Sequence, residues 1–500
     1  MNGTAATEVP VREPWMTAGN LCAQVHETHT GVVTLIGDKA FKAKKPICTD
    51  FLDFSTAGLR EYACQREVAL NRRLAPDSYL GVGHFTLQQG AVAEPVIVMR
   101  RYPDSTRLAA RVRRGDSVDE ILAAIADKVA RFHRDAVRGQ AIDEQATVAA
   151  TSARWQENLA ELERYAEAVV PHESLKAIRQ SANQFLTGRA GLFAQRIAEG
   201  RIVDGHGDLL SEDIFCLPDG PILLDCLEFD DALRYVDGID DVAFLAMDLE
   251  FLGRRDLADF FLAEYLRCAD DTAPSSLTDF CIAYRAVVRA KVDCIRVAQG
   301  HAEAVEDARI HIHIALDRLR SCTVRLIMIG GGPGTGKTTL SHALAERIGA
   351  EVISTDDVRR ELQQSGVITG RVGDLDVGLY APENVSAVYR EVLQRARPRL
   401  GAGRTVILDG TWRDAGERER AHALAAETAS SAIEFTCTVP VREASARIAA
   451  RRESSSDATP QIAAALGKVG ADGTTSFSID TARPLADSVA EAQRLCCLTF

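Results

Sequence analysis

The sequence predicts a two-domain α+β and α/β protein: an N-terminal α+β domain, then a C-terminal α/β domain with a parallel sheet flanked by helices. The residues before about 320 open with strand-like segments and continue mainly as helical patterns, whereas those after it alternate strand and helix. A chain of 500 residues is also longer than one domain usually is. The predicted domains are 1–320, with a small lobe at about 25–105 and a helical lobe at about 106–320, and 321–500.

The composition is that of an ordinary globular protein, with 46% hydrophobic residues, 26% charged residues and a net charge of −13. This surplus of acids argues against a nucleic-acid partner bound by general positive charge. No apolar stretch approaches the roughly 20 residues that span a bilayer, so we expect no membrane partner. The first residues lack the basic start and apolar core of a secretory signal, and the 12 cysteines form no C-x-x-C pair. We therefore expect reduced thiols and a cytoplasmic location.

The strongest motif is the glycine-rich segment GGGPGTGKTT, which follows a strand-like run at 324–329 and precedes a predicted helix at 339–348. It matches the pattern G-x-x-x-x-G-K-S/T in the strand–loop–helix context that gives the pattern its meaning. Backbone N–H groups of such a loop wrap phosphates, and the helix N-terminus adds partial positive charge. Lys337 would neutralise the β- and γ-phosphates and act in catalysis, and the Thr338 hydroxyl would bind Mg²⁺. The predicted cofactors are ATP and Mg²⁺, and the predicted nucleotide-binding residues are Gly331, Gly332, Gly334, Thr335, Gly336, Lys337, Thr338 and Thr339.

Two further acids follow strand-like runs, where a parallel sheet places its chemistry. Asp409 is predicted to support Mg²⁺, with a turn residue before a glycine as the alternative. Asp356 is predicted to position an acceptor hydroxyl, with a helix N-cap as the alternative. Arg447 and Arg451 share one face of a predicted helix and would stabilise the transferring phosphoryl group, or form a solvated face.

The glycine-rich loop, the segment STDDVR at 354–359, the segment VILDGT at 406–411 and the arginine pair resemble the small-molecule branch of P-loop kinases. This is the group of gluconate kinase, shikimate kinase and zeta toxin. The resemblance covers about 322–500 and implies a P-loop NTPase fold with phosphoryl transfer to a small molecule.

A second motif, DGHGDL, lies between two short strand-like runs, each of which delivers an acid into a loop. Asp208 could accept the proton of an attacking hydroxyl, Asp225 could hold Mg²⁺ on ATP, and His206 could brace the loop. Phosphoryl transfer needs mainly positioning and metal, so this small set is sufficient.

This pattern resembles the aminoglycoside phosphotransferase and choline kinase family, which has the bilobal protein-kinase fold, over about 25–320. The resemblance implies that Lys42, or Lys44 on the same strand face, binds the nucleotide with Glu67 as its paired acid. It also implies that Asp225 and position 213 bind metal. Position 213 is Asp here and Asn in the family.

Asp208, Asp213 and Asp225 would repel one another unless metal is bound. This departure supports an alternative function, in which an N-terminal pseudokinase binds a ligand and regulates a C-terminal P-loop ATPase. The acidic run from 225 to 241 predicts either a pocket for a cationic acceptor or a set of helix caps and solvated loop.

The whole chain resembles the bifunctional aminoglycoside phosphotransferase and ATP-binding protein type of actinobacteria. Segments that carry this resemblance include FKAKKP at 41–46 and LNRRLAPDSYLGV at 70–82. The sequence therefore predicts an ATP- and Mg²⁺-dependent phosphotransferase with two nucleotide sites, whose partner is an unidentified small-molecule acceptor.

Overall fold

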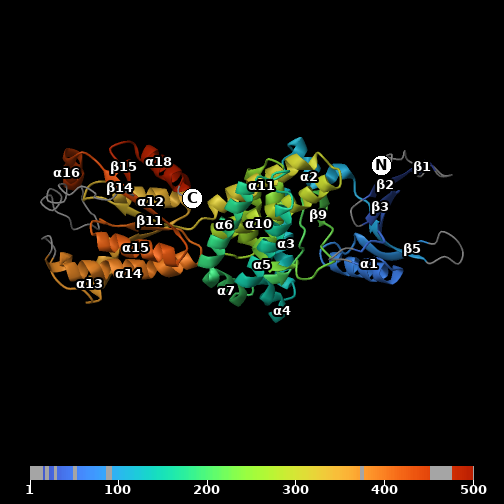
Figure 1. Cartoon of the computed structure of the whole chain (residues 1–500), viewed down its shortest axis with the longest axis horizontal. Helices are drawn as coiled ribbons and strands as arrows, with labels where there is room; N and C mark the ends of the chain where they lie inside the picture. Colours follow the sequence, from blue (N-terminus) through green and yellow to red (C-terminus); the bar gives the residue numbers. More distant parts are fainter. Residues whose placement is uncertain are drawn as a thin grey trace, which may run out of the picture. The chain divides into compact units, whose positions relative to one another are not determined.

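The computed structural model describes residues 15–16, 22–27, 31–48, 53–85, 93–371, 377–450 and 476–498 (Figure 1). By packing, the chain divides into two units, Met1–Gln145 with Ile202–Asp271, and Ala146–Arg201 with Thr272–Phe500. The second unit therefore groups part of the predicted helical lobe with the C-terminal fold. The domain boundary between residues 320 and 321 stays a prediction.

The first unit begins with a six-stranded antiparallel sheet in the order β1-β2-β3-β4-β6-β5. Its strands are β1 (Trp15–Met16), β2 (Cys22–Glu27), β3 (Gly31–Ile36), β4 (Lys39–Lys44), β5 (Tyr79–Phe85) and β6 (Glu94–Arg100). Strands β3 and β4 form a hairpin, and Gly37 supplies the left-handed φ of 59° in its turn. Helix α1 (Ala57–Asn71) begins after Thr56, whose hydroxyl accepts the N–H of Leu59 at 3.2 Å.

The rest of the first unit is mainly helical and carries two short two-stranded ribbons. Its helices are α2 (Leu108–Arg114), α3 (Asp119–Asp135), α4 (Gln140–Asp143), α8 (Gly238–Phe251) and α9 (Arg255–Cys268). The ribbons pair β7 (Ile202–Asp204) with β10 (Tyr235–Asp237), and β8 (Ile214–Leu217) with β9 (Gly220–Leu223). A sheet with one helix, followed by helices and ribbons, is the protein-kinase-like α+β arrangement that the sequence predicts.

The second unit contains five helices that precede the C-terminal sheet, α5 (Val148–Glu163), α6 (His172–Gly188), α7 (Ala190–Ala198), α10 (Ser275–Ala298) and α11 (Ala304–Ser321). Arg189, after α6, is 1% exposed and donates to the carbonyl oxygen of Thr428 at 2.9 Å. Ser276 Oγ, on α10, donates to the carbonyl oxygen of Gly403 at 2.6 Å. Helices from the earlier part of the chain are thus bonded to turns of the C-terminal fold.

The C-terminal sheet is five-stranded and parallel, in the order β12-β13-β11-β14-β15. Its strands are β11 (Arg325–Gly330), β12 (Glu351–Ser354), β13 (Val406–Asp409), β14 (Ser431–Thr438) and β15 (Phe477–Asp480). The helices are α12 (Lys337–Ile348), α13 (Thr355–Gln364), α14 (Pro382–Gly401), α15 (Ala415–Glu427), α16 (Val441–Ala450) and α18 (Leu485–Leu498).

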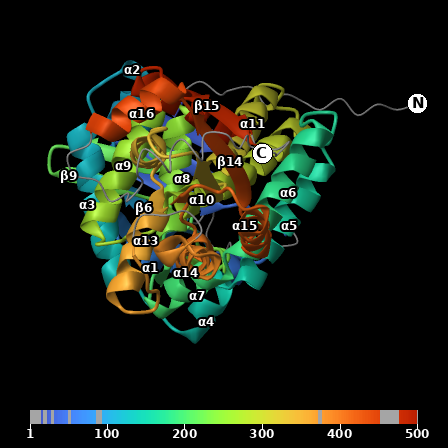
Figure 2. The ribbon, with the colours of Figure 1, turned by 90° about the vertical axis from the view of Figure 1, so that its left-hand side faces the viewer.

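Two apolar cores cover the two faces of this sheet. One core joins α12 and α18 to one face, and the other joins α13, α14 and α15 to the opposite face. Figure 1 shows α12 above β11 and α15 below it, and the neighbouring helices α14 and α15 are seen together in Figure 2. The predicted parallel sheet flanked by helices is confirmed.

Among the described residues, no helix combines the length and the apolar character needed to cross a bilayer. The cysteines whose side chains the structure describes are free thiols.

Candidate active sites

The glycine-rich loop joins the central strand β11 to helix α12. The strand ends at Gly330 and the helix begins at Lys337. Gly334 and Gly336 have left-handed φ angles of 79° and 83°, which favour glycine. A Cβ atom at Gly334 would lie 2.5 Å from the carbonyl oxygen of Ala444. Glycine at 334 therefore lets the turn pack against α16, and both glycines leave the backbone of the turn without a side chain at these positions.

The other predicted loop residues lie in the same turn. Thr335 Oγ1 donates to the carbonyl oxygen of Gly332 at 2.8 Å. A Cβ atom at Gly331 would lie 2.6 Å from that hydroxyl. Thr339 is in the first turn of α12. The structure thus brings the predicted nucleotide-binding loop together at the start of one helix.

Thr338 and Asp409 meet beside this loop. Thr338 Oγ1 donates to Asp409 Oδ2 at 2.7 Å, because parallel pairing places Asp409 opposite Ile329 at the end of β11. Asp409 is 2% exposed, and its Oδ1 atom is buried without a hydrogen-bond partner among the described residues. Burial raises the pKa of the Asp409 carboxyl, although Lys337 acts in the opposite sense. A hydroxyl beside a carboxylate with one unbonded oxygen fits Mg²⁺, which prefers oxygen ligands and keeps several waters.

Asp356 lies in the first turn of α13 and is paired with Arg359. Arg359 Nη1 donates to Asp356 Oδ1 at 2.5 Å, and the guanidinium lies 4.8 Å from the ring centroid of Tyr380. Ser354 caps this helix, since its hydroxyl accepts the N–H of Asp356 at 3.2 Å. The alternative in which Asp356 is the N-cap is therefore wrong. Ser354, two residues before Asp356, pairs in register with Asp409. Asp356 and Asp409 therefore both lie at the carboxyl end of the parallel strands.

Arg447, on α16, lies beside the glycine-rich loop. A Cβ atom at Gly336 would lie 3.3 Å from Arg447 Nη1. Arg447 Nη2 donates to Glu443 at 2.5 Å and to the carbonyl oxygen of Thr481 at 2.8 Å. These contacts place the Arg447 guanidinium at the loop. The second arginine of the predicted pair, Arg451, lies outside the described residues.

The N-terminal site is built on two lysines of β4. Lys42 Nζ lies 2.8 Å from Glu67 Oε1 and 2.6 Å from Asp225 Oδ1. Lys44 Nζ lies 2.5 Å from Glu67 Oε2 and also pairs with Glu228. Desolvation disfavours charge on Lys42, but Asp225 and Glu67 outweigh it and raise the pKa of this ammonium well above its ordinary value. Both candidate lysines therefore pair with the acid of α1, and Lys42 alone also reaches Asp225.

The other two predicted acids lie in the segment between β7 and β8. The N–H of Asp208 donates to His206 Nδ1 at 3.3 Å, and Asp213 ends the short helix η3 (Ser211–Asp213). Burial, together with the charges of Asp225 and Asp208, raises the pKa of Asp213 well above its ordinary value. This is the direction expected for acids that repel one another without a bound cation.

Desolvation is the largest single influence on Asp225 and acts to raise its pKa. The two lysines act in the opposite sense, and the net pKa of Asp225 is below the ordinary value. Among the described residues, no three His, Cys, Asp or Glu side chains are grouped as a metal-binding cluster. A cation at Asp213 and Asp225 would therefore need phosphate or water oxygens as further ligands.

Asp241 is a site residue that the sequence does not reveal. This fully buried carboxylate of α8 accepts the N–H groups of His206 and Gly207, each at 2.7 Å. It also lies 2.8 Å from His133 Nε2, and these contacts keep the pKa of Asp241 far below its ordinary value despite burial. A Cβ atom at Gly205 would lie 2.6 Å from Asp241, so the turn before Asp208 requires glycine there.

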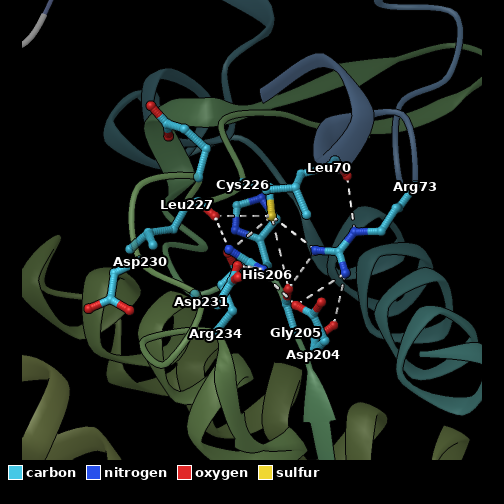
Figure 3. A network of polar contacts seen from close by, with 12 residues as sticks. Leu70, Arg73, Asp204, Gly205, His206, Cys226, Leu227, Asp230, Asp231 and Arg234 are labelled. Atoms are coloured by element: carbon cyan, nitrogen blue, oxygen red, sulfur yellow. Dashed lines mark hydrogen bonds and ion pairs between the residues drawn. The ribbon is translucent and has the colours of Figure 1, made fainter. Parts of the chain in front are cut away.

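His206 braces the loop, as predicted from its position. Its Nε2 atom lies 3.1 Å from the carbonyl oxygen of Leu224, next to Asp225. Because Nδ1 accepts from Asp208, the proton belongs on Nε2. Burial lowers the pKa of His206. Figure 3 shows this ring among the polar contacts that link 204–206 to Cys226.

Several members of the acidic run from 225 to 241 have structural partners. Asp237 caps α8 by accepting the N–H of Ile239 at 2.9 Å. Asp231 pairs with Arg66 and Arg234, and Asp241 is buried. These contacts favour caps and ion pairs over a pocket for a cationic acceptor.

Comparison with known proteins identifies one domain family and a set of relatives. Residues 326–469 match the AAA domain family AAA_33. The chain is 56% identical over 471 residues to the uncharacterized proteins Rv2004c of Mycobacterium tuberculosis and Mb2027c of Mycobacterium bovis, covering 94% of this chain and 95% of each relative. The chain belongs to the same family as these mycobacterial proteins.

Several of the solved structures that this chain resembles are named as kinases. They include a gluconokinase from Sinorhizobium meliloti (18% identical, 34% of this chain and 92% of that chain, TM-score 0.26). A choline/ethanolamine kinase family protein from Mesorhizobium loti is 12% identical, over 61% of this chain and 93% of that chain, with TM-score 0.36. APH(2")-IIia, in a GDP and kanamycin complex, is 12% identical over 59% of this chain and 94% of that chain, with TM-score 0.38. The region that matches AAA_33 contains the glycine-rich loop.

Proposed function

We propose that the protein is an ATP- and Mg²⁺-dependent phosphotransferase that acts on a small-molecule hydroxyl and has two nucleotide sites. The observation that carries this proposal is the pair of Thr338 and Asp409, 2.7 Å apart beside a bare glycine turn, with one buried carboxylate oxygen left unbonded. The free thiols of the described residues support a reducing compartment, and we propose the cytoplasm.

In the C-terminal site, backbone N–H groups of 331–338 would bind the phosphates of ATP, and Lys337 would neutralise their charge. Thr338 and Asp409 would hold Mg²⁺, which supplies charge neutralisation on the transferring group. Asp356 would orient the acceptor hydroxyl, while Arg359 keeps this carboxylate in place. Arg447 is close enough to the loop to stabilise charge on the γ-phosphoryl group.

In the N-terminal site, Asp208 would accept the proton of a second acceptor hydroxyl. Lys42 would bind the phosphates, held in position by Glu67 at 2.8 Å. Asp213 and Asp225 would hold Mg²⁺, whose charge would also relieve the repulsion between these acids. The turn that carries Asp208 is held by Asp241 before any ligand binds.

A metabolite library tested with ATP labelled in its γ-phosphate, using the wild type and the variants Lys337→Ala and Asp208→Asn, would identify acceptors. We expect Lys337→Ala to abolish transfer at the C-terminal site and Asp208→Asn to abolish transfer at the N-terminal site. Arg397→Ala is the matched control, since this arginine lies on the surface of α14 and pairs with Glu427. Absence of transfer to any acceptor by the wild type, with Mg²⁺ and ATP present, would contradict the proposal.

A second candidate function is an N-terminal pseudokinase that regulates the C-terminal site. The observation that favours it is Asp at position 213, which brings a third carboxylate to the site of Asp208 and Asp225; burial and the charges of these two acids raise the pKa of Asp213. If only Lys337→Ala abolishes transfer, while Asp208→Asn leaves every product unchanged, the proposed catalysis by the N-terminal region fails and the second function remains for it.

A further inference from the structure

The segment 70–82, with the sequence LNRRLAPDSYLGV, joins the end of α1 to β5, and none of its side chains has a role in the chemistry proposed above. We propose that this segment is a brace in which Arg73, aided by Asn71, holds the two acid-bearing loops of the N-terminal site against α1. The site is then assembled before a nucleotide arrives. The catalytic consequence of the brace rests on the proposed function, whereas its structural consequence does not.

Arg73 contacts both loops at once (Figure 3). Its Nη1 atom donates to the carbonyl oxygen of Asp204 at 3.1 Å, and its Nη2 atom donates to the carbonyl oxygen of Gly205 at 2.8 Å. The same Nη2 atom lies 3.2 Å from Cys226 Sγ. Asp204 and Gly205 lead directly into the turn of Asp208, and Cys226 directly follows Asp225. One planar guanidinium therefore sets the distance between the two loops, which the single point charge of a lysine cannot do.

Arg73 is itself held on three sides. Its Nε atom donates to the carbonyl oxygen of Leu70 at 3.1 Å, which fixes it to the end of α1. Its guanidinium lies 5.1 Å from the ring centroid of Phe132 on α3. It also forms an ion pair with Asp204 at 3.3 Å, and Arg234 donates to the same carboxylate at 2.8 Å. The brace thus has a defined geometry rather than a loose surface contact.

Asn71 and Tyr79 tie the same segment to the Asp225 loop. Asn71 is 1% exposed, and its Oδ1 atom accepts the N–H of Cys226 at 2.8 Å while its Nδ2 atom donates to the carbonyl oxygen of Glu67 at 3.0 Å. The hydroxyl of Tyr79 accepts the N–H of Asp225 at 3.2 Å. The backbone amides of Asp225 and Cys226, at the start of this loop, are therefore both bound by side chains of 70–82.

These contacts close a ring through the site. Glu67 on α1 pairs with Lys42, Lys42 pairs with Asp225, and the chain after Asp225 returns to α1 through Asn71 and Arg73. A displacement of α1 would break the brace and the lysine pair together. The contacts that set the position of α1 thus lie within the fold itself.

Hydrogen exchange of the full chain tests the brace directly. The variants are Arg73→Lys, which keeps the charge, and Arg73→Met, which keeps an unbranched apolar stem but removes the guanidinium. We expect exchange of the backbone amides in 204–208 and 225–228 to become about tenfold faster in both variants, with peptides of β11 and α12 unchanged. Arg131→Met is the control, because Arg131 is exposed on α3 and pairs with Asp127. Unchanged exchange in the two loops, or equal acceleration throughout the chain, would overturn the proposal.

Kinetics then separate the brace from the proposed function. In a Lys337→Ala background, only the N-terminal site can report transfer. We expect Arg73→Lys to lower kcat about tenfold or more while KM for ATP changes less than about threefold, since misplaced loops affect the reacting groups more than phosphate binding. A fall in kcat matched by an equal rise in KM for ATP would contradict a positioning role. If this background shows no transfer even with Arg73 intact, the proposed activity of the site fails, and the exchange result alone decides the brace.

Discussion

At the residue scale, Asp409 illustrates how folding and chemistry place opposite demands on one side chain. Its buried carboxylate has an unbonded oxygen and a raised pKa, so the charged form is disfavoured in the folded protein. We expect Asp409→Asn to stabilise the protein in the absence of Mg²⁺ by about 1 kcal/mol. The same variant should lose about a hundredfold or more in transfer by the C-terminal site, because the metal loses a charged ligand. Thermal unfolding without Mg²⁺ and a transfer assay with it measure the two effects.

The control for this prediction is Asp414→Asn, which changes an acid in the same loop that caps α15 instead of facing the metal site. This control should leave both stability and transfer nearly unchanged, because Asn caps a helix about as well as Asp. A destabilised Asp409→Asn protein with normal transfer would show that Asp409 has a structural role.

The two lysines of β4 should differ in what they support, although they lie on one strand face. Lys44 is 4% exposed and pairs with Glu67, which is fully buried, and with Glu228, which is mostly buried. Removing its charge leaves Glu228 without this lysine and leaves Glu67 with Lys42 as its remaining lysine partner, so Lys44→Met should cost about 3 kcal/mol of stability. Lys42→Met leaves Glu67 paired with Lys44 and should cost clearly less stability, while abolishing nucleotide binding at this site. Thermal unfolding and equilibrium binding of ATP, measured in a Lys337→Ala background, test the contrast, and equal destabilisation by the two variants would refute it.

Residues near one another in sequence were the predictable part of each site. Lys337, Thr338 and the glycines around them follow from local spacing alone. The roles of Lys42 and Glu67 were predicted only from a family resemblance, and in the structure Lys44 also pairs with Glu67. Asp241 was assigned to an acidic run because nothing local shows that a residue so far along the chain accepts the N–H groups of the turn before Asp208. Long-range contacts of this kind depend on packing that the sequence pattern does not contain.

At the element scale, the neutral His206 holds the turn that carries Asp208. Its backbone N–H bonds Asp241 of α8, and its ring bonds Leu224 just after β9. Burial lowers the pKa of His206, so as pH falls below about 6.5 the unfolded chain binds a proton that the folded chain resists. The contribution of His206 to stability is thus complete above that pH and declines below it. We expect the stability difference between the wild type and His206→Asn to shrink as pH is lowered from about 8 to about 5, which thermal unfolding at several pH values measures. A difference that is constant over this range would contradict the buried, neutral state of the ring.

Individual elements were predictable where local patterns are strong. The strand before the glycine-rich loop and the helix after it were placed within two residues of β11 and α12. The alternative in which Asp356 caps α13 was wrong, because Ser354 and Asp356 are both good capping residues and only the structure shows which one bonds the helix amides. The bonds from Arg189 and Ser276 to turns of the C-terminal fold were not foreseen, since no periodicity marks the residues that receive them.

At the scale of the whole molecule, we assign two nucleotide sites of different construction to one chain. The C-terminal site uses a backbone loop, and the N-terminal site uses side chains of a sheet and a braced helix. We expect Lys337→Ala to remove one of two ATP-binding events and Lys42→Met to remove the other, with the double variant binding none. Isothermal titration of the three proteins with ATP and Mg²⁺ counts the sites, and retention of a single unaffected event in the double variant would contradict this assignment.

The most direct test of the central claim is hydrogen exchange of the backbone amides in 331–338, measured with and without ATP and Mg²⁺. If these amides bind the phosphates, their exchange should slow by about a hundredfold at saturating nucleotide in the wild type and stay fast in Lys337→Ala. Exchange in this loop that is the same with and without nucleotide would show that the turn does not hold a polyphosphate.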